Sequence, residues 1–242
     1  MTSQVLRRAP TSLTEDINIK HEKLRYGDGN AFLLNQTGDV TWKYQNHNGI
    51  GIAACSRSAT MYMVHLLWKL GLNVAHEQQG ADGLVGYHLA VIKPDNCLHQ
   101  VRHPLKQISS NVAHRSWGFA DQVMDLPDFG LLSCMRYWLT WNEMCEEFCV
   151  WRYQIENLPN IWDEFLERIG HAPCPLPDVP INTNTQDKYG KFKQYTWADL
   201  FNEDRQLAEA IQDKAVQYGY DTPEMDKVEY QNLRELETAE VA

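Results

Sequence analysis

The sequence predicts an α/β protein in which helices cover both faces of a central, mostly parallel sheet. Two observations predict this class. Short apolar runs of strand length alternate along the chain with segments whose apolar residues recur at helical spacing. Polar clusters also follow three of these runs directly, where the ligand-binding edge of a parallel sheet would lie. Strands that alternate with helices are typical of a three-layer architecture with right-handed crossovers.

The first part of the chain contributes three predicted strands. An apolar run at 50–54 predicts the opening strand, and the helix that follows at 60–70 ends at Gly71. Two further short strands are predicted at 72–75 and 97–101.

The second part adds more helices around one more strand. Pro104 suits the first turn of a helix, because its fixed φ fits there and its missing N–H would have no partner. A long, aromatic-rich helix is predicted to lie in the core, and a proline-rich link precedes the C-terminal helices. The predicted elements of this part are helices at 104–114, 131–147, 158–170, 197–201 and 204–218, and a strand at 148–153.

One domain accounts for most of the chain. The 242 residues, 43% of them hydrophobic, suffice for one substantial core. We expect it to span 31–220, after a lead-in arm at 1–30 and before an acidic tail at 221–242. The net charge of −10 argues against binding to nucleic acid or to an anionic membrane. Six cysteines without a CxxC pair indicate reduced thiols, and no run reaches the roughly 18 apolar residues of a membrane-spanning helix, so we expect a cytoplasmic protein.

The most informative segment is the turn that joins the opening strand to the first helix, Ser-Arg-Ser-Ala-Thr at 56–60. Backbone N–H groups at a helix N-terminus lack intrahelical partners, and the helix dipole favours an anion there. Ser56, Ser58 and Thr60 add hydroxyl groups, and the guanidinium of Arg57 can bind two oxygens of a phosphate or sulfate at once. The turn therefore predicts a site for a phosphorylated or sulfated ligand.

Polar residues at two other strand ends are expected to join this turn. His76 and Glu77 follow the second predicted strand, and Arg102 follows the third. Ser110 lies eight residues after Arg102, about two helical turns on, and can face the same point. Because the carboxyl ends of parallel strands lie at one edge of a sheet, we expect the three clusters to meet in one crevice.

In this order, the motifs resemble the PAPS-dependent sulfotransferases, whose donor is 3′-phosphoadenosine-5′-phosphosulfate (PAPS). The likeness begins with a strand, Ser-Arg-Ser-Ala-Thr and a helix, followed by Arg-x-Pro and a serine eight residues after the arginine. It covers the residues from about 48 to 220, and the looser bacterial members of the family match three further stretches. These stretches are 72–77 with Asp82-Gly83, 155–158, and 195–200 before a helix that ends in Tyr218-Gly219-Tyr220.

The resemblance implies a P-loop NTPase-like fold and a donor site made of two parts. The loop would surround the 5′-phosphosulfate, and the second arginine and its serine, with a basic segment at 188–193, would hold the 3′-phosphate. Ala59 stands where the family has glycine, so the backbone there either avoids a positive φ or accepts strain. The residues that the resemblance assigns to the donor are Ser56, Arg57, Ser58, Ala59, Thr60, Arg102, Ser110 and Lys191.

Sulfuryl transfer also needs a stabilised leaving group and a base. Charge develops on the bridging oxygen, so positioning and electrostatics supply most of the catalysis, and Arg57 is expected to stabilise the leaving group. Glu77 follows a strand into the crevice and is the first candidate for the base, ahead of His88, whereas His76 is expected to point the other way. The loop lacks the Gly-Lys-Ser/Thr ending that holds Mg²⁺ in P-loop kinases, so no metal is expected.

The resemblance implies a small-molecule acceptor with a hydroxyl or amine group. The acidic and aromatic composition favours a cationic acceptor, because carboxylates and ring faces bind cations. One such acceptor is a guanidinium natural product of the saxitoxin type, which some of the looser bacterial members sulfate. Two other functions stay open, a P-loop phosphotransferase (a small-molecule kinase) and a nucleotide-binding protein without catalytic activity. The oligomeric state is also open, with a homodimer as one alternative.

Overall fold

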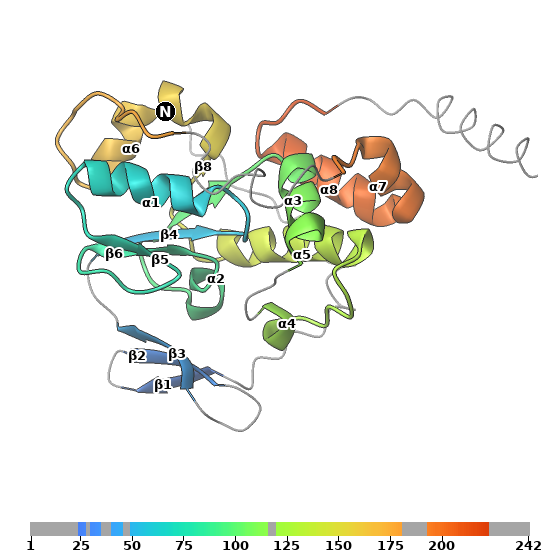
Figure 1. Ribbon diagram of the computed structural model, residues 1–242, viewed down its shortest axis with the longest axis horizontal. Helices are drawn as coiled ribbons and strands as arrows, with labels where there is room; N and C mark the ends of the chain where they lie inside the picture. Colours follow the sequence, from blue (N-terminus) through green and yellow to red (C-terminus); the bar gives the residue numbers. More distant parts are fainter. Residues whose placement is uncertain are drawn as a thin grey trace, which may run out of the picture.

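The structure is a computed structural model of the chain and describes residues 24–27, 30–34, 40–45, 49–115, 120–180 and 193–222. These residues form a three-stranded antiparallel sheet, followed in the chain by a larger parallel sheet with helices packed around it (Figure 1). Most of the expected lead-in arm and of the expected acidic tail lies outside the described residues.

The larger sheet has five strands in the order β5-β6-β4-β7-β8, and all four of its strand pairs are parallel. The predicted parallel sheet is therefore confirmed, and the strand that opens it along the chain lies at its centre. The strands are β4 (Ile50–Ala54), β5 (Val74–His76), β6 (Gly83–Gly86), β7 (Leu98–Val101) and β8 (Trp151–Gln154).

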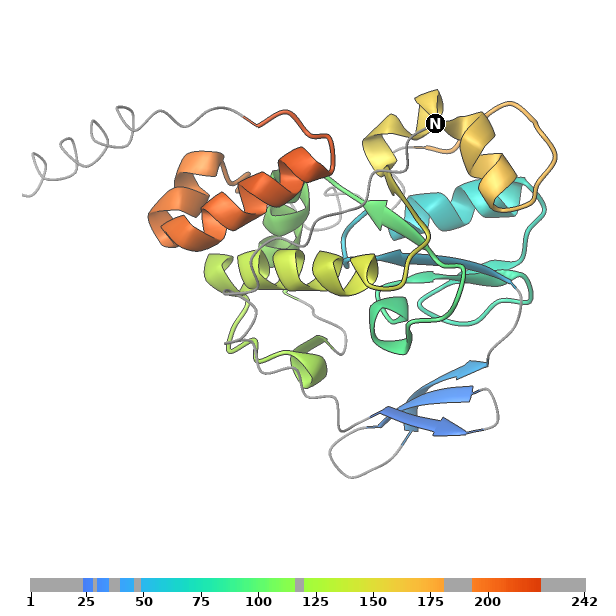
Figure 2. The ribbon, with the colours of Figure 1, turned by 180° about the vertical axis from the view of Figure 1, so that it is seen from behind.

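Helices cover both faces of this sheet, as predicted. Figure 1 shows α1 and α6 above the sheet and α2 below it, and Figure 2 shows the same layers from behind. The helices are α1 (Thr60–Lys69), α2 (Leu89–Ile92), α3 (Pro104–His114), α4 (Ala120–Val123), α5 (Leu131–Glu146), α6 (Trp162–Arg168), α7 (Trp197–Glu203) and α8 (Arg205–Gln217), with a 3-10 helix, η2 (Ile155–Asn160), before α6.

The two faces of the sheet carry separate hydrophobic cores, because alternate residues of a strand point to opposite faces. In β4, Ile52 packs with residues of α1 and α6, whereas Ala53 packs with residues of α2, α3, α5 and α8. The second core is built around α5, whose Trp138 and Trp141 are fully buried. Each layer is thus fixed to the sheet by apolar burial.

One strand begins two residues later than predicted because of the way in which α1 ends. Gly71 ends the helix as predicted, with a positive φ of 82°, and its N–H donates to the carbonyl of Trp68. The N–H of Leu72 donates to the carbonyl of Leu67 at 3.0 Å, which completes a Schellman motif. Leu72 therefore belongs to the helix end, and β5 begins at residue 74 instead of 72.

The smaller sheet lies before the parallel sheet in the chain, in a region where the sequence predicted no strand. It pairs three strands in the order β1-β2-β3, and the register between the second and the third shifts at Leu33/Leu34. Its strands are β1 (Leu24–Gly27), β2 (Asn30–Leu34) and β3 (Val40–Gln45).

Within the described ranges, no helix combines the length and the apolar character that crossing a bilayer requires.

Removal of the Phe165 ring should destabilise the fold strongly. This side chain is fully buried beside Tyr153 of β8 and Trp162, so Phe165→Ala should lower the free energy of unfolding by about 3–5 kcal/mol. Val216→Ala, on the exposed side of α8, should change it by less than about 0.5 kcal/mol. Urea unfolding measures both, and equal effects of the two changes would contradict this core.

Candidate anion-binding site

The strand order brings the predicted polar clusters to one edge of the sheet. Because all its strands run in the same direction, the residues that follow them lie together at the carboxyl edge. The chain leaves β4 toward β5 on one side and leaves β7 toward β8 on the other, so a topological switch point lies between β4 and β7, where open α/β sheets bind ligands. The residues at this edge include the loop at 55–60, His76, Glu77, His88, Arg102 and Glu156.

The anion loop, which we define as residues 55–60, has the backbone of an anion-binding turn. Arg57 and Ala59 have left-handed φ angles of 65° and 62°, whereas Ser58 between them does not. Alternation of this kind turns successive N–H groups to one side and forms a concavity that binds anions. Ala59 thus accepts the strain expected for a non-glycine residue here, and it stands at the N-cap of α1, whose N-terminus receives no side-chain cap.

Three consecutive carbonyl groups of the anion loop accept hydrogen bonds from side chains of β7, the residue after it, and α3. The carbonyl of Ser56 accepts from Nε2 of Gln107 at 2.6 Å, and that of Arg57 accepts from Nη1 of Arg102 at 2.8 Å. The carbonyl of Ser58 accepts from Nε2 of Gln100 at 2.5 Å. The C=O and N–H of adjoining residues in one trans peptide unit point in opposite directions. The N–H groups of Arg57 and Ala59 therefore face away from these donors.

One face of α3 lies against the anion loop. Gln107, Ser110, Asn111 and His114 are spaced three and four residues apart, so they share a side of the helix. Ser110 Oγ accepts a hydrogen bond from Arg57 Nε at 3.1 Å. Burial lowers the pKa of His114, and the charge of Arg57 lowers it further, which places that guanidinium close to the same helix face.

Ser56 connects the anion loop to α5 and α3 by hydrogen bonds. Its N–H donates to the hydroxyl of Tyr137 at 3.1 Å, and its own hydroxyl donates to Oδ1 of Asn111 at 3.0 Å. Ser56 as a whole is 8% exposed, and Ser58 is 1% exposed. Both residues, whose hydroxyls the sequence assigned to the donor, therefore lie inside the protein, and their backbone N–H and C=O groups also have partners there.

His76 faces the anion loop, so the prediction that it points away is wrong. Its Nε2 lies 2.8 Å from the hydroxyl oxygen of Thr60 and 3.5 Å from Oε1 of Glu77. The prediction assumed regular strand alternation, but Glu77 has a positive φ of 55° and leaves the strand. Both side chains consequently reach the same edge.

The ionisable groups on this side of the anion loop differ in basicity. Burial lowers the pKa of His76 to about 4, with a further contribution from the charge of Arg57, and burial lowers the pKa of His88 to about 3. Both imidazoles are therefore neutral near pH 7 and weakly basic. Burial raises the pKa of Glu77, while Arg57 opposes that shift. A carboxylate whose pKa is raised is a stronger base than an unperturbed one, which favours Glu77 as the general base.

The two residues expected at the 3′-phosphate both contact residue 57 in this structure. Arg102 Nη1 donates to the Arg57 carbonyl, and Ser110 accepts from the Arg57 side chain. The structure thus brings Arg57, Arg102 and Ser110 together at the switch point. Lys191, the remaining expected donor residue, lies outside the described residues.

Sequence reasoning missed Gln100 and Gln107, which hold the anion loop in place. Gln100 is fully buried in β7, where its Oε1 accepts a hydrogen bond from the Tyr153 hydroxyl at 2.8 Å. A glutamine inside an apolar strand run is a signal that could have found it, because a buried amide requires partners. Gln107 gave no such signal, since polar residues are common on helices.

One hollow among the described residues lies apart from this site. It measures about 500 Å³ and lies at the amino edge of the sheet. Residues that line it include Gly49, Ile50, Asp82, Asn96 and Arg168. In the part of the chain that the structure describes, no three His, Cys, Asp or Glu side chains cluster as metal ligands would.

The chain matches no model of a known protein family, and a comparison with curated protein sequences finds no relative.

Replacement of Ala59 by glycine should stabilise the protein. Glycine adopts the left-handed conformation without the clash of a Cβ atom, so Ala59→Gly should raise the free energy of unfolding by about 0.5–1 kcal/mol. Ala210→Gly, within α8, should lower it by about 1 kcal/mol. Urea unfolding of both variants checks the prediction, which fails when both changes destabilise.

Removal of the Arg57 charge should raise two pKa values. Arg57→Gln should raise the pKa of His76 above about 4, because protonation of the ring no longer opposes a nearby cation, and should raise the pKa of Glu77 as well. An NMR titration of the imidazole signals measures the first effect, with Arg168→Gln on α6 as a control that leaves it unchanged. An unaltered pKa of His76 in Arg57→Gln would show that the guanidinium does not lie close to this imidazole, and would contradict this arrangement.

Proposed function

We propose that this protein transfers a sulfuryl group from PAPS to a hydroxyl or amine of a small molecule. The observation that carries the proposal is the convergence of the anion loop, Arg57, Arg102 and Ser110 at the switch point between β4 and β7. These groups offer two sets of donors for one ligand, as a nucleotide with charged groups at both its 5′ and 3′ positions requires. The resemblance of the ordered sequence motifs to sulfotransferases supplies the choice of sulfate over other anions.

The anion loop would bind the 5′-phosphosulfate through backbone N–H groups and the N-terminus of α1. Left-handed angles at Arg57 and Ala59 support this role, because they form the concavity that suits an anion. Arg102 and Ser110 would bind the 3′-phosphate, each by exchanging its present contact with Arg57 for a phosphate oxygen. That exchange would also release Arg57 Nε for the donor, so binding at the two ends would be coupled.

The transfer would break the bond between sulfur and the bridging oxygen and form a bond between sulfur and the acceptor atom. Arg57 would stabilise the negative charge that develops on the bridging oxygen, which leaves with adenosine 3′,5′-bisphosphate. Glu77 would accept the proton that the acceptor loses. The low basicity of His76 and His88 supports Glu77 over both imidazoles, although His88 was also a candidate from the sequence.

The acceptor would be a small molecule with a cationic group, such as a guanidinium alkaloid. Support comes from the net charge of −10 and from the Glu77 carboxylate at the β5 side of the site. The six cysteines are all free thiols, which supports a reducing compartment such as the cytoplasm.

Loss of Arg57 should abolish the reaction without unfolding the protein. With ³⁵S-labelled PAPS and a panel of cationic acceptors, Arg57→Ala should reduce transfer by at least about 100-fold, the usual effect of deleting one charge-stabilising group. Arg168→Ala, on the exposed side of α6, should leave transfer unchanged. Full activity of Arg57→Ala would reject this role, and Mg²⁺-dependent phosphate transfer from ATP by the wild-type protein would favour a kinase instead.

A further inference from the structure

We propose that Glu156, held by Tyr220, is a positioning residue that fixes Arg102 against the anion loop. The segment after α8 would thereby control the shape of the loop. The identity of the ligand bound by the loop rests on the proposed function, but the positioning itself does not.

Glu156 connects three separate parts of the chain. Its Oε1 accepts a hydrogen bond from the backbone N–H of His103, at the start of α3, at 3.1 Å. Its Oε2 accepts one from the hydroxyl of Tyr220, beyond α8, at 2.9 Å. The N–H that it accepts from belongs to the residue after Arg102, so the carboxylate fixes the backbone from which the Arg102 side chain extends. Its Oε1 also lies 4.0 Å from Nζ of Lys106, and its charge opposes the lowering of the Arg102 pKa by burial.

Arg102 transmits this arrangement to the anion loop. Its Nη1 donates to the carbonyl of Arg57, which is itself in a left-handed conformation. That conformation is unfavourable for a residue with a Cβ atom, so the loop depends on contacts that hold its carbonyl groups. Without the carboxylate that binds the His103 N–H, the backbone beside Arg102 would be less firmly held, and so would its guanidinium.

Tyr220 reaches Glu156 because of the way in which α8 ends. Gly219 has a positive φ of 82°, and the N–H of Tyr220 donates to the carbonyl of Ala215 at 3.0 Å, so a Schellman motif turns the chain back over the helix. The ring of Tyr220 also packs edge to face against His103, with 5.2 Å between ring centroids. Tyr220 thus contacts a residue after β7 through its ring and a residue after β8 through its hydroxyl.

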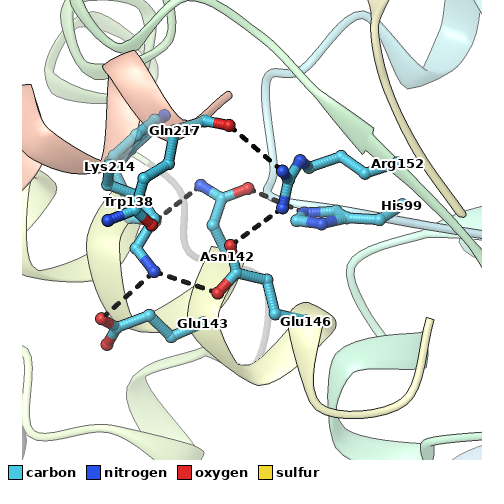
Figure 3. Close-up of polar contacts among 8 residues, drawn as sticks. All are labelled: His99, Trp138, Asn142, Glu143, Glu146, Arg152, Lys214 and Gln217. Atoms are coloured by element: carbon cyan, nitrogen blue, oxygen red, sulfur yellow. Dashed lines mark hydrogen bonds and ion pairs between the residues drawn. The ribbon is translucent and has the colours of Figure 1, made fainter. Parts of the chain in front are cut away.

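An ion-pair cluster fixes the last turns of α8 (Figure 3). Lys214 of α8 is buried, and its Nζ lies 3.0 Å from Glu146 and 3.8 Å from Glu143, both on α5. Arg152 of β8 donates to Glu146 at 3.1 Å and to the carbonyl of Gln217 at 3.2 Å. The end of α8 is therefore tied to α5 and β8, which gives Tyr220 a rigid base.

A second, inner connection runs in the same direction. The hydroxyl of Tyr153 in β8 donates to Oε1 of Gln100 in β7, and Nε2 of Gln100 donates to the Ser58 carbonyl. This inner connection runs from β8 through Gln100 to the Ser58 carbonyl. The outer connection runs from Glu156, after β8, through the segment at 102–103 to the Arg57 carbonyl. Of these two connections, only the outer one includes ionised groups. Removal of the Glu156 charge should therefore weaken the outer connection and leave the inner one intact.

Hydrogen–deuterium exchange of the ligand-free protein tests the proposal. Glu156→Gln should speed exchange of the amides in the anion loop about tenfold, the effect of weakening one charge-assisted contact, while amides of α5 keep their wild-type rates. Tyr220→Phe should change the loop in the same direction by a smaller factor. Glu164→Gln, which removes an exposed carboxylate from α6, is the matched control and should leave the loop unchanged.

The outcomes separate this proposal from the proposed function. Unchanged loop exchange in Glu156→Gln overturns the positioning role whatever the protein binds, and faster exchange throughout the protein shows a general structural role and overturns it as well. Faster exchange confined to the loop, in a wild-type protein that binds neither PAPS nor adenosine 3′,5′-bisphosphate, would support the positioning role and reject the sulfotransferase.

Discussion

Three hydrogen bonds to consecutive carbonyl groups hold the anion loop, and the site depends on them. Gln107, Arg102 and Gln100 bind the carbonyls of residues 56–58 from one side. The peptide geometry then turns the N–H groups of Arg57 and Ala59 away from these donors, at the cost of left-handed angles at the same two residues. The N–H of Ser58 donates to the Cys55 carbonyl within the loop. A strained backbone of this kind persists only where its surroundings fix it. Here the buried amides of Gln100 and Gln107 and a guanidinium provide that constraint.

The same arrangement explains the electrostatics of the edge. Because the loop places Arg57 between α3 and the end of β5, its charge acts on His114 on one side and on His76 and Glu77 on the other. The imidazoles remain neutral, and Glu77 remains the carboxylate beside the cation. The cation and the carboxylate thus follow different strands, β4 and β5, which β6 separates in the sheet. The proposed transfer would use them as separate cationic and basic groups.

The sequence predicted the parallel sheet, the first loop and the convergence of its polar clusters, because these follow from local patterns and from strand direction. It missed β6, since a four-residue strand bounded by Gly83 and Gly86 shows little hydrophobic pattern. It expected the last strand at 148–153, but β8 begins at Trp151, because Phe148 and Cys149 still donate to the Cys145 carbonyl at the end of α5. The orientation of His76 depends on one positive φ, and the partners of Gln107 lie about 50 residues away, so no local rule reveals either.

In the proposed function, the anion loop and the pair Arg102 and Ser110 bind opposite ends of one nucleotide. Calorimetry of the wild-type protein and of Ser110→Ala with adenosine 3′,5′-bisphosphate and with adenosine 5′-monophosphate tests it most directly. The wild-type protein should bind the bisphosphate at least about tenfold more tightly than the monophosphate, and Ser110→Ala should lose much of this preference, because one charge-assisted hydrogen bond contributes about 1.5–3 kcal/mol. Equal affinity of the wild-type protein for the two nucleotides would contradict it.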